Sequence, residues 1–233
     1  MQAATCVQLF GCFRLMVDGR IAHIPLQAQR LVAFVAVGSA PVDRQLLAER
    51  LWPFSRHARA HANLRTALWR VRQAAPAMLT VSSDAIELGS QVTVDYRQFL
   101  ESDRFRTPTC ERAQLIKDLR AELLPGWDED WLTIERERAR QMRMRRLEEM
   151  SRDLLTSGRT AEAIEAAFAS IEIEPLRESA HLALIEAHVK DGNRAEAVHQ
   201  VERVRAMLRE ELGIGPSSQF LDRLTQLGLT STA

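Results

Sequence analysis

The sequence predicts a mainly α-helical fold with a small β component, arranged as an α/β domain followed by an all-α domain. Two similar stretches, residues 157–164 and 191–198, place Gly158 and Gly192 34 residues apart. This is the period of a tetratricopeptide helix–turn–helix repeat. The first 95 residues instead show strand and helix patterns in alternation. Charge divides in the same way, since residues 1–100 carry a net charge of +5 and the remainder a net charge of −5.

The N-terminal domain is predicted to begin with a small sheet. Alternation of apolar and polar residues indicates three strands, at residues 7–10, 13–17 and 21–24. Asp18-Gly19, between the second and third strands, is typical of a hairpin turn. A second hairpin is expected near the end of this domain, from alternating runs at residues 78–81, 85–88 and 92–94.

Three helices are predicted between these two groups of strands, at residues 29–37, 43–52 and 58–74. Asp43 is expected to cap the second helix and Pro53 to end it. In the third helix Leu64, Leu68 and Val71 recur at the spacing of a buried stripe. A sheet, three helices and a C-terminal hairpin follow the order of a winged helix-turn-helix domain, in which the third helix enters the major groove of DNA.

The third predicted helix carries residues suited to that role. Between residues 44 and 72, seven arginines accompany a single acidic residue, Glu49. We expect seven side chains off the apolar stripe to contact DNA: Arg59, Asn63, Arg65, Thr66, Trp69, Arg70 and Arg72. Arg65 and Trp69 lie one turn apart, and the flanking arginines are expected to bind phosphates. Trp69 leaves two alternatives open, a contact with DNA or packing against the other domain.

From about residue 109 onward the sequence predicts helices only. The breaks fall at Pro125-Gly126, Gly158, Pro175, Gly192 and residues 213–216. After each repeat glycine, small alanines allow the next helix to pack closely. The predicted domains are therefore a winged helix-turn-helix domain over residues 1–103 and an all-α, tetratricopeptide-like domain over residues 104–233. Residues 101–108 are the least structured stretch in the sequence and the expected boundary.

Several motifs carry a family resemblance. In the C-terminal half they are Leu124–Trp127, Trp131, Glu135–Arg138, Gly158, Glu162-Ala163, Glu174–Glu178, Gly192, Glu196-Ala197 and Leu208–Ser217. In the N-terminal half they are Leu9–Gly11, Asp18-Gly19, Gln29-Arg30, Leu47–Trp52, Leu64–Arg72, Asp95 and Phe99. The first set resembles the bacterial transcriptional activation domain of the antibiotic regulatory protein (SARP) family. The second set resembles its companion, an OmpR-type winged helix.

The resemblance implies a transcriptional activator. Such a protein would bind direct repeats near promoters as side-by-side protomers, hence at least as a homodimer on double-stranded DNA, and would help RNA polymerase to engage. The loop between the second and third helices would contact the polymerase through Pro53, Phe54, Ser55, Arg56 and His57. The third helix would contact the DNA.

Location and redox state follow from what the sequence lacks. No apolar run approaches the roughly 20 residues needed to span a bilayer, and the N-terminus shows no export signal. We therefore expect a cytoplasmic, nucleoid-associated protein without a membrane partner. The cysteines show no C-x-x-C spacing and are expected to be free thiols: Cys6, Cys12 and Cys110.

Enzyme and cofactor functions find no support in the sequence. Phosphate-binding, dinucleotide-binding and nucleophile-elbow motifs are all absent, and paired carboxylates at residues 128–130 and 148–149 are expected to be solvated. His57 and His61 have the spacing of a zinc-binding pair, but no third ligand is evident, so we expect neither a metal nor a cofactor. An alternative function remains, that of a docking protein whose winged helix does not read DNA.

Overall fold

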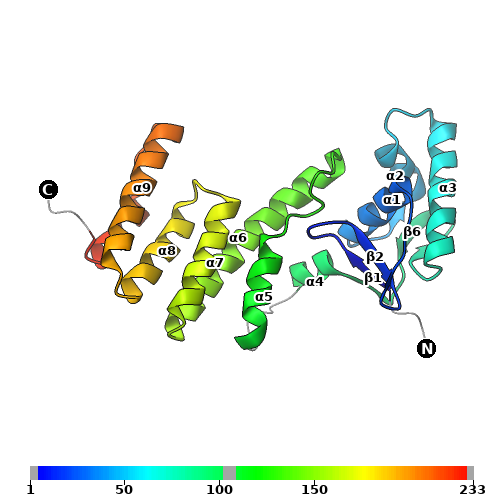
Figure 1. Cartoon of the computed structure of the whole chain (residues 1–233). Helices are drawn as coiled ribbons and strands as arrows, with labels where there is room; N and C mark the ends of the chain where they lie inside the picture. Colours follow the sequence, from blue (N-terminus) through cyan, green and yellow to red (C-terminus); the bar gives the residue numbers. More distant parts are fainter. Residues whose placement is uncertain (1–4, 102–108, 230–233) are drawn as a thin grey trace. The chain divides into compact units, whose positions relative to one another are not determined.

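The chain folds into two compact units, described by a computed structural model for residues 5–101 and 109–229 (Figure 1). Unit 1 consists of Met1–Asp103 together with Glu122–Glu137. Unit 2 consists of Arg104–Ala121 together with Arg138–Ala233. The domain boundary expected after residue 103 falls outside the described residues, and the division at that point stays a prediction.

Unit 1 contains a four-stranded sheet in the order β3-β2-β1-β7. Its strands are β1 (Thr5–Gln8), β2 (Arg14–Val17), β3 (Arg20–Ile21) and β7 (Val92–Val94). The turn predicted at Asp18-Gly19 is confirmed, since both residues have the positive φ angles, 50° and 75°, that a type I′ turn requires. The prediction that residues 92–94 belong to the second hairpin is wrong. β7 instead pairs in parallel with β1, where Val94 lies opposite Val7.

The three predicted helices are confirmed as α1 (Leu26–Val37), α2 (Arg44–Leu51) and α3 (His57–Ala74). Asp43 caps α2 as expected, because its Oδ1 accepts a hydrogen bond from the backbone N–H of Leu46 at 2.8 Å. Most of α1 is apolar, and it contributes the largest number of buried residues among these helices: Ala28, Leu31, Val32, Ala33, Val35, Ala36 and Val37. A helix apolar on most of its surface must be covered on several sides, and α1 is the central helix of the unit.

A second, three-stranded sheet forms the wing. Its order is β4-β6-β5, with β4 at Val42–Asp43, β6 at Ala85–Leu88 and β5 at Leu79–Val81. The hairpin of β5 and β6 was predicted, and the turn is closed by Ser82, whose backbone N–H donates to the carbonyl of Ala85 at 2.9 Å. The two-residue strand β4 was not predicted. It connects the wing directly to the start of α2, so the wing and the helices form one winged helix-turn-helix.

A half-buried carboxylate joins the four-stranded sheet to α4 (Asp95–Glu101). The side chain of Asp95 accepts hydrogen bonds from the backbone N–H groups of Leu9 (2.9 Å) and Phe10 (3.0 Å). Burial raises the pKa of Asp95 above its ordinary value, and these hydrogen bonds oppose that rise. Two residues further, the guanidinium of Arg97 donates to carbonyl oxygens at the C-terminus of α1. Helix α4 therefore fixes the end of β1 and the end of α1 at the same time.

Residues 122–137 return to unit 1 and extend it through backbone hydrogen bonds. The N–H of Leu124 donates to the carbonyl of Leu9 at 2.8 Å, and the N–H of Gly11 donates to the carbonyl of Glu122 at 2.8 Å. Leu123 forms an antiparallel bridge with Phe10. This short segment therefore pairs with the residues that directly follow β1, beyond the end of the four-stranded sheet.

Aromatic and charged side chains of the same segment complete the contact with α1. The indole ring of Trp131 lies 5.0 Å from the ring of Phe34, centroid to centroid. Its Nε1–H donates to Glu129 at 2.8 Å, and Glu129 in turn forms a bidentate ion pair with Arg30 of α1. Nearby, the hydroxyl of Tyr96 donates to a carboxylate oxygen of Glu135 at 2.6 Å, and the rings of Phe13 and Trp127 are stacked.

The described part of unit 2 consists of helices. They are α5 (Thr109–Arg120), α6 (Thr133–Thr156, its first residues in unit 1), α7 (Thr160–Ile173), α8 (Glu178–Lys190), α9 (Arg194–Leu212) and α10 (Ser218–Gln226). Helix α7 packs against α8 and α8 against α9 (Figure 1). None of the helices in residues 5–101 and 109–229 is long and apolar enough to cross a membrane.

The repeat inferred from the sequence is confirmed. Gly158 and Gly192 both have left-handed backbones, with φ of 74° and 80°, at the turns that precede α7 and α9. Five residues after each glycine, Ala163 and Ala197 are completely buried. The hydroxyl of Thr160 donates to Oδ1 of Asp191 at 2.8 Å. This bond ties the turn of the first repeat to the turn of the second.

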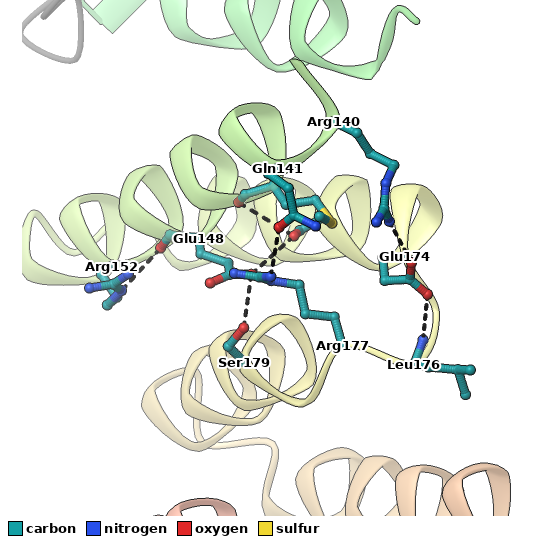
Figure 2. Close-up of polar contacts among 10 residues, drawn as sticks. Arg140, Gln141, Glu148, Arg152, Glu174, Leu176, Arg177 and Ser179 are labelled. Atoms are coloured by element: carbon teal, nitrogen blue, oxygen red, sulfur yellow. Dashed lines mark hydrogen bonds and ion pairs between the residues drawn. The ribbon is translucent and has the colours of Figure 1, made fainter. Parts of the chain in front are cut away.

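Glu148 corrects the expectation that the carboxylates at residues 148–149 are solvated (Figure 2). It lies on α6 and is only 5% exposed. Its Oε1 accepts from Nε of Arg177 at 2.5 Å and from the hydroxyl of Ser179 at 3.0 Å. Arg177 also reaches Oε1 of Gln141 at 3.5 Å. The buried charge is thus paired, and it holds α6 to the start of α8.

His181 is a second buried polar residue of unit 2. Its Nε2 lies 2.7 Å from the carbonyl of Pro175, and its Nδ1 lies 2.5 Å from Nε2 of Gln200. A neutral imidazole satisfies both contacts, donating from Nε2 and accepting at Nδ1. Burial lowers the pKa of His181 below its ordinary value, and the charge of Arg203 acts in the same direction. The fold therefore favours the neutral ring.

Candidate nucleic-acid interface

The interface is built on the amphipathic character of α3. The residues of α3 that are buried are Ala60, Leu64, Ala67 and Val71, which recur at intervals of three or four. The predicted stripe is confirmed for Leu64 and Val71, while Leu68 is only half-buried. The stripe holds α3 against α1 and α2, and it leaves the opposite face of the helix in solvent.

The predicted contact residues all lie on α3, and most of them are on this open face. Asn63 is half-buried. The other six are exposed: Arg59, Arg65, Thr66, Trp69, Arg70 and Arg72. The hydroxyl of Thr66 donates to the carbonyl of Ala62 at 3.0 Å. The guanidinium of Arg70 lies 4.8 Å from the ring centroid of Trp69, a cation–π contact. Trp69 itself is 53% exposed, which agrees with its expected place off the buried stripe.

The arginines of this face differ in how they are engaged. Within the described part of the chain, the side chains of Arg59, Arg65 and Arg72 form neither an ion pair nor a hydrogen bond. Arg70 is held over the indole ring instead. Because unpaired guanidinium groups suit phosphates and base edges alike, the exposed face is a strong candidate for contact with a polyanion.

A hollow of about 490 Å³ lies between α3 and strand β5. Arg65, Trp69 and Arg72 line it from α3, and Leu79 and Val81 line it from β5. Its lining therefore combines apolar side chains with arginines.

One arginine of this hollow was not predicted from the sequence. Arg44, the first residue of α2, also lines the hollow, and its Nη1 donates to the carbonyl of Ser82 in the wing turn at 3.3 Å. Its backbone N–H donates to the carbonyl of Asp84 at 2.9 Å. The pairing of β4 with β6 brings Arg44 beside the wing turn, and that pairing leaves no signal in the local sequence.

The loop expected to contact RNA polymerase precedes α3. Phe54 at its tip is completely exposed, and the N–H of Ser55 donates to the carbonyl of Trp52 at 3.0 Å. Pro53 and Arg56 are also exposed. His57 is not part of the loop but the first residue of α3, with Arg56 at the N-cap position.

His57 and His61, the pair considered for zinc, lie close together. Their Nε2 atoms are 3.1 Å apart, a hydrogen-bond distance. Among residues 5–101 and 109–229, the structure brings together no group of three or more potential metal ligands. The thiols of Cys6 and Cys12 are free, and the side chain of Cys110 lies outside the described residues.

Comparison with known proteins supports the architecture. Residues 112–226 match the family described as the bacterial transcriptional activator domain. The fold is similar to that of Mycobacterium tuberculosis EmbR, solved in complex with a low affinity phosphopeptide, with a TM-score of 0.82 and 16% sequence identity. The similarity covers 97% of this chain and 65% of EmbR, so the chain spans less than two thirds of that protein's length. No curated protein matches the sequence.

Proposed function

We propose that the chain is a SARP-type bacterial transcriptional regulator and that it acts by binding promoter DNA through the exposed face of α3. The match of residues 112–226 to the bacterial transcriptional activator domain supports this proposal. In this proposal the chain is a regulator and not an enzyme. The observation that carries the proposal is the set of unpaired arginines on one face of α3, beside a hollow edged by Arg44. In this proposal residues 1–103 form the DNA-binding domain and residues 104–233 the activator domain.

Phosphate contacts supply most of the binding energy in this proposal. Arg59, Arg65 and Arg72 have no acidic partner among the described residues, so they bind DNA without first losing an ion pair. Each phosphate they neutralise releases counterions, and binding therefore weakens steeply as salt rises. Contacts to base edges, made by the residues in the middle of α3, add the sequence preference.

Activation is assigned to the loop before α3. Phe54 in this loop is completely exposed, so its ring is accessible to a protein partner. RNA polymerase is the proposed partner, with Pro53, Ser55, Arg56 and His57 around the same contact. The chain would bind promoter repeats as side-by-side protomers, at least as a homodimer, and each protomer would present one such loop. We expect this protein to be cytoplasmic and nucleoid-associated.

The test of DNA binding is fluorescence anisotropy of the full chain with labelled duplex from its own upstream region. A scrambled duplex and a salt titration accompany it. Arg65→Ala is expected to weaken binding by about 1–3 kcal/mol and to reduce the preference over scrambled DNA, as for an arginine that reads a base. Arg20→Ala is the matched control, because Arg20 is an exposed arginine on β3, away from α3.

The same titration separates DNA reading from the docking alternative. A docking protein would bind the native and scrambled duplexes equally weakly at low salt, and Arg65→Ala with Arg70→Ala would leave its protein partner bound. For the loop, Phe54→Ala is expected to lower transcription from the promoter in vitro while the DNA affinity stays unchanged. If transcription is unchanged too, the loop does not contact the polymerase.

A further inference from the structure

The open face of α3 places an unpaired donor and a large aromatic ring on one stripe. Arg65 and Trp69 are four residues apart and so lie one above the other on the helix. Arg65 has no side-chain partner among the described residues, and Trp69 is 53% exposed. An exposed indole and an unpaired guanidinium side by side favour a ligand with two matching features. The indole favours contact with an apolar group, and the guanidinium favours a pair of hydrogen-bond acceptors.

The indole ring is already held in place. Arg70 lies over it at 4.8 Å, and Leu79 and Val81 of β5 line the same hollow as the ring. Val81 is itself 46% exposed, so the apolar surface continues from the helix towards the wing. A ring held in this way loses little conformational freedom on binding, and such preorganisation strengthens an interaction without any new contact.

The major groove offers few groups that match this stripe. The apolar group that a base edge presents there is the C5-methyl of thymine, whereas guanine presents two adjacent acceptors, O6 and N7. A guanidinium matches the guanine pair, and an indole matches the methyl group. Positions four residues apart are about 6 Å apart along a helix axis, and stacked bases are about 3.4 Å apart. The two contacts therefore fall about two base pairs apart.

From this geometry, and resting on the proposed function, we propose that Trp69 makes the chain thymine-selective. The indole contacts the C5-methyl of a thymine, and Arg65 donates to a guanine about two base pairs away. Trp69 is then a specificity-determining residue, and the preferred DNA contains a guanine and a thymine at that fixed separation.

The experiment is a selection of bound duplexes from a randomised pool by the full chain, followed by a single-group change in the selected site. Replacing the thymine with deoxyuridine removes only the methyl group. We expect the unaltered chain to bind the deoxyuridine duplex about fourfold more weakly, the loss that corresponds to one buried methyl-sized group. Trp69→Ala should bind both duplexes equally, because its methyl contact is already gone.

Two further variants sharpen the comparison. Trp69→Leu keeps an apolar side chain and should retain part of the discrimination between thymine and deoxyuridine. Ile21→Ala, which removes an exposed apolar side chain on β3, should retain all of it. Far-UV circular dichroism verifies that each variant is folded, which is expected since both positions are exposed.

The outcomes separate this proposal from the proposed function. The thymine contact is overturned if the selected sequence contains no thymine. It is also overturned if removal of the methyl group weakens the DNA affinity of Trp69→Ala as much as that of the unaltered chain. Either result leaves the proposal of DNA binding unchanged. Failure to retain any duplex at low salt overturns the proposed function, and thymine selectivity with it. A fourfold loss that disappears in Trp69→Ala and persists in Ile21→Ala supports the assignment.

Discussion

Trp131→Ala tests whether residues 122–137 are part of unit 1 in solution. The indole of Trp131 packs against Phe34 and donates to Glu129. Truncating a fully buried aromatic residue costs about 3–5 kcal/mol, and Trp131 is half-buried, so we take about 2 kcal/mol for lost packing. The hydrogen bond adds about 1 kcal/mol, since Glu129 keeps its ion pair with Arg30 and is not left unpaired. The expected loss in the free energy of unfolding is about 3 kcal/mol.

Scanning calorimetry of the full chain measures this loss. For a chain of this length each kcal/mol lowers the melting temperature by about 2–4 °C, so we expect the transition of unit 1 to fall by about 6–12 °C. Trp131→Phe keeps a ring against Phe34 but loses the indole donor and part of the ring area, so it should cost at least about 1 kcal/mol and less than Trp131→Ala.

Phe54→Ala is the matched control for this measurement. Its ring is completely exposed, so its removal should change stability by less than about 0.5 kcal/mol. A melting temperature for Trp131→Ala that equals that of Phe54→Ala would refute the reasoning. Residues 122–137 would then not be part of the cooperative unit that contains α1.

Three further predictions concern His181, Glu148 and Gly89. Burial lowers the pKa of His181 below 6.5, so the unfolded state binds more protons than the folded state. The stability that His181 contributes should be full above pH 6.5 and fall as the pH drops below that value. Chemical unfolding across this pH range measures the fall, and His199→Gln, at an exposed histidine, should leave the pH dependence of stability unchanged. Glu148→Gln should destabilise unit 2 by about 3 kcal/mol, because Arg177 loses its ion-pair partner. Urea unfolding measures this loss of stability. A loss no larger than that from the same change at an exposed glutamate would contradict the prediction. Gly89→Ala should cost about 1–3 kcal/mol in thermal unfolding, since a Cβ there would lie 2.1 Å from a backbone carbonyl oxygen, and an unchanged melting temperature would show that the wing yields freely.

Local signals in the sequence were enough to predict the helices and the repeat. Asp43 could be recognised as a cap because capping depends on the residue and its next three neighbours, and the bond to Leu46 confirms it. Gly158 and Gly192 could be recognised because a left-handed backbone favours glycine over other residues. In each case the physical cause lies within a few residues of the effect.

Pairings between distant segments could not be predicted in the same way. From the sequence, residues 92–94 were assigned to the nearer hairpin. In the structure their partner is β1, where Val7 lies opposite Val94 although the two are far apart in the sequence. Backbone groups make these pairings, and every residue except proline offers the same donor and acceptor. Glu148 was misjudged for a related reason, because its burial depends on Arg177 and Ser179 of another helix.

For the candidate site, the periodicity of α3 predicted which side chains would be exposed, and the structure places six of the seven in solvent. Helix periodicity could not predict the hollow, because β5 supplies one side of it. Arg44 was missed for the same reason. Whether these residues contact DNA stays a prediction that the binding experiments test.

The extent of the DNA-binding unit has a direct experimental consequence. Residues 122–137 lie within the stretch matched to the activator domain, residues 112–226, and yet they pack in unit 1. A fragment of residues 1–103 would leave the rings of Phe13 and Phe34 without their tryptophan partners and would lose the backbone bonds to Leu9 and Gly11. We therefore expect this fragment to melt at a lower temperature than unit 1 in the full chain, and to bind DNA more weakly because less of it is folded. Equal melting temperatures and equal affinities for the same duplex would show that α1 and the four-stranded sheet are stable without residues 122–137. The winged helix would then be an independent module, and the contacts of Trp127 and Trp131 would attach this segment to it without supporting its fold.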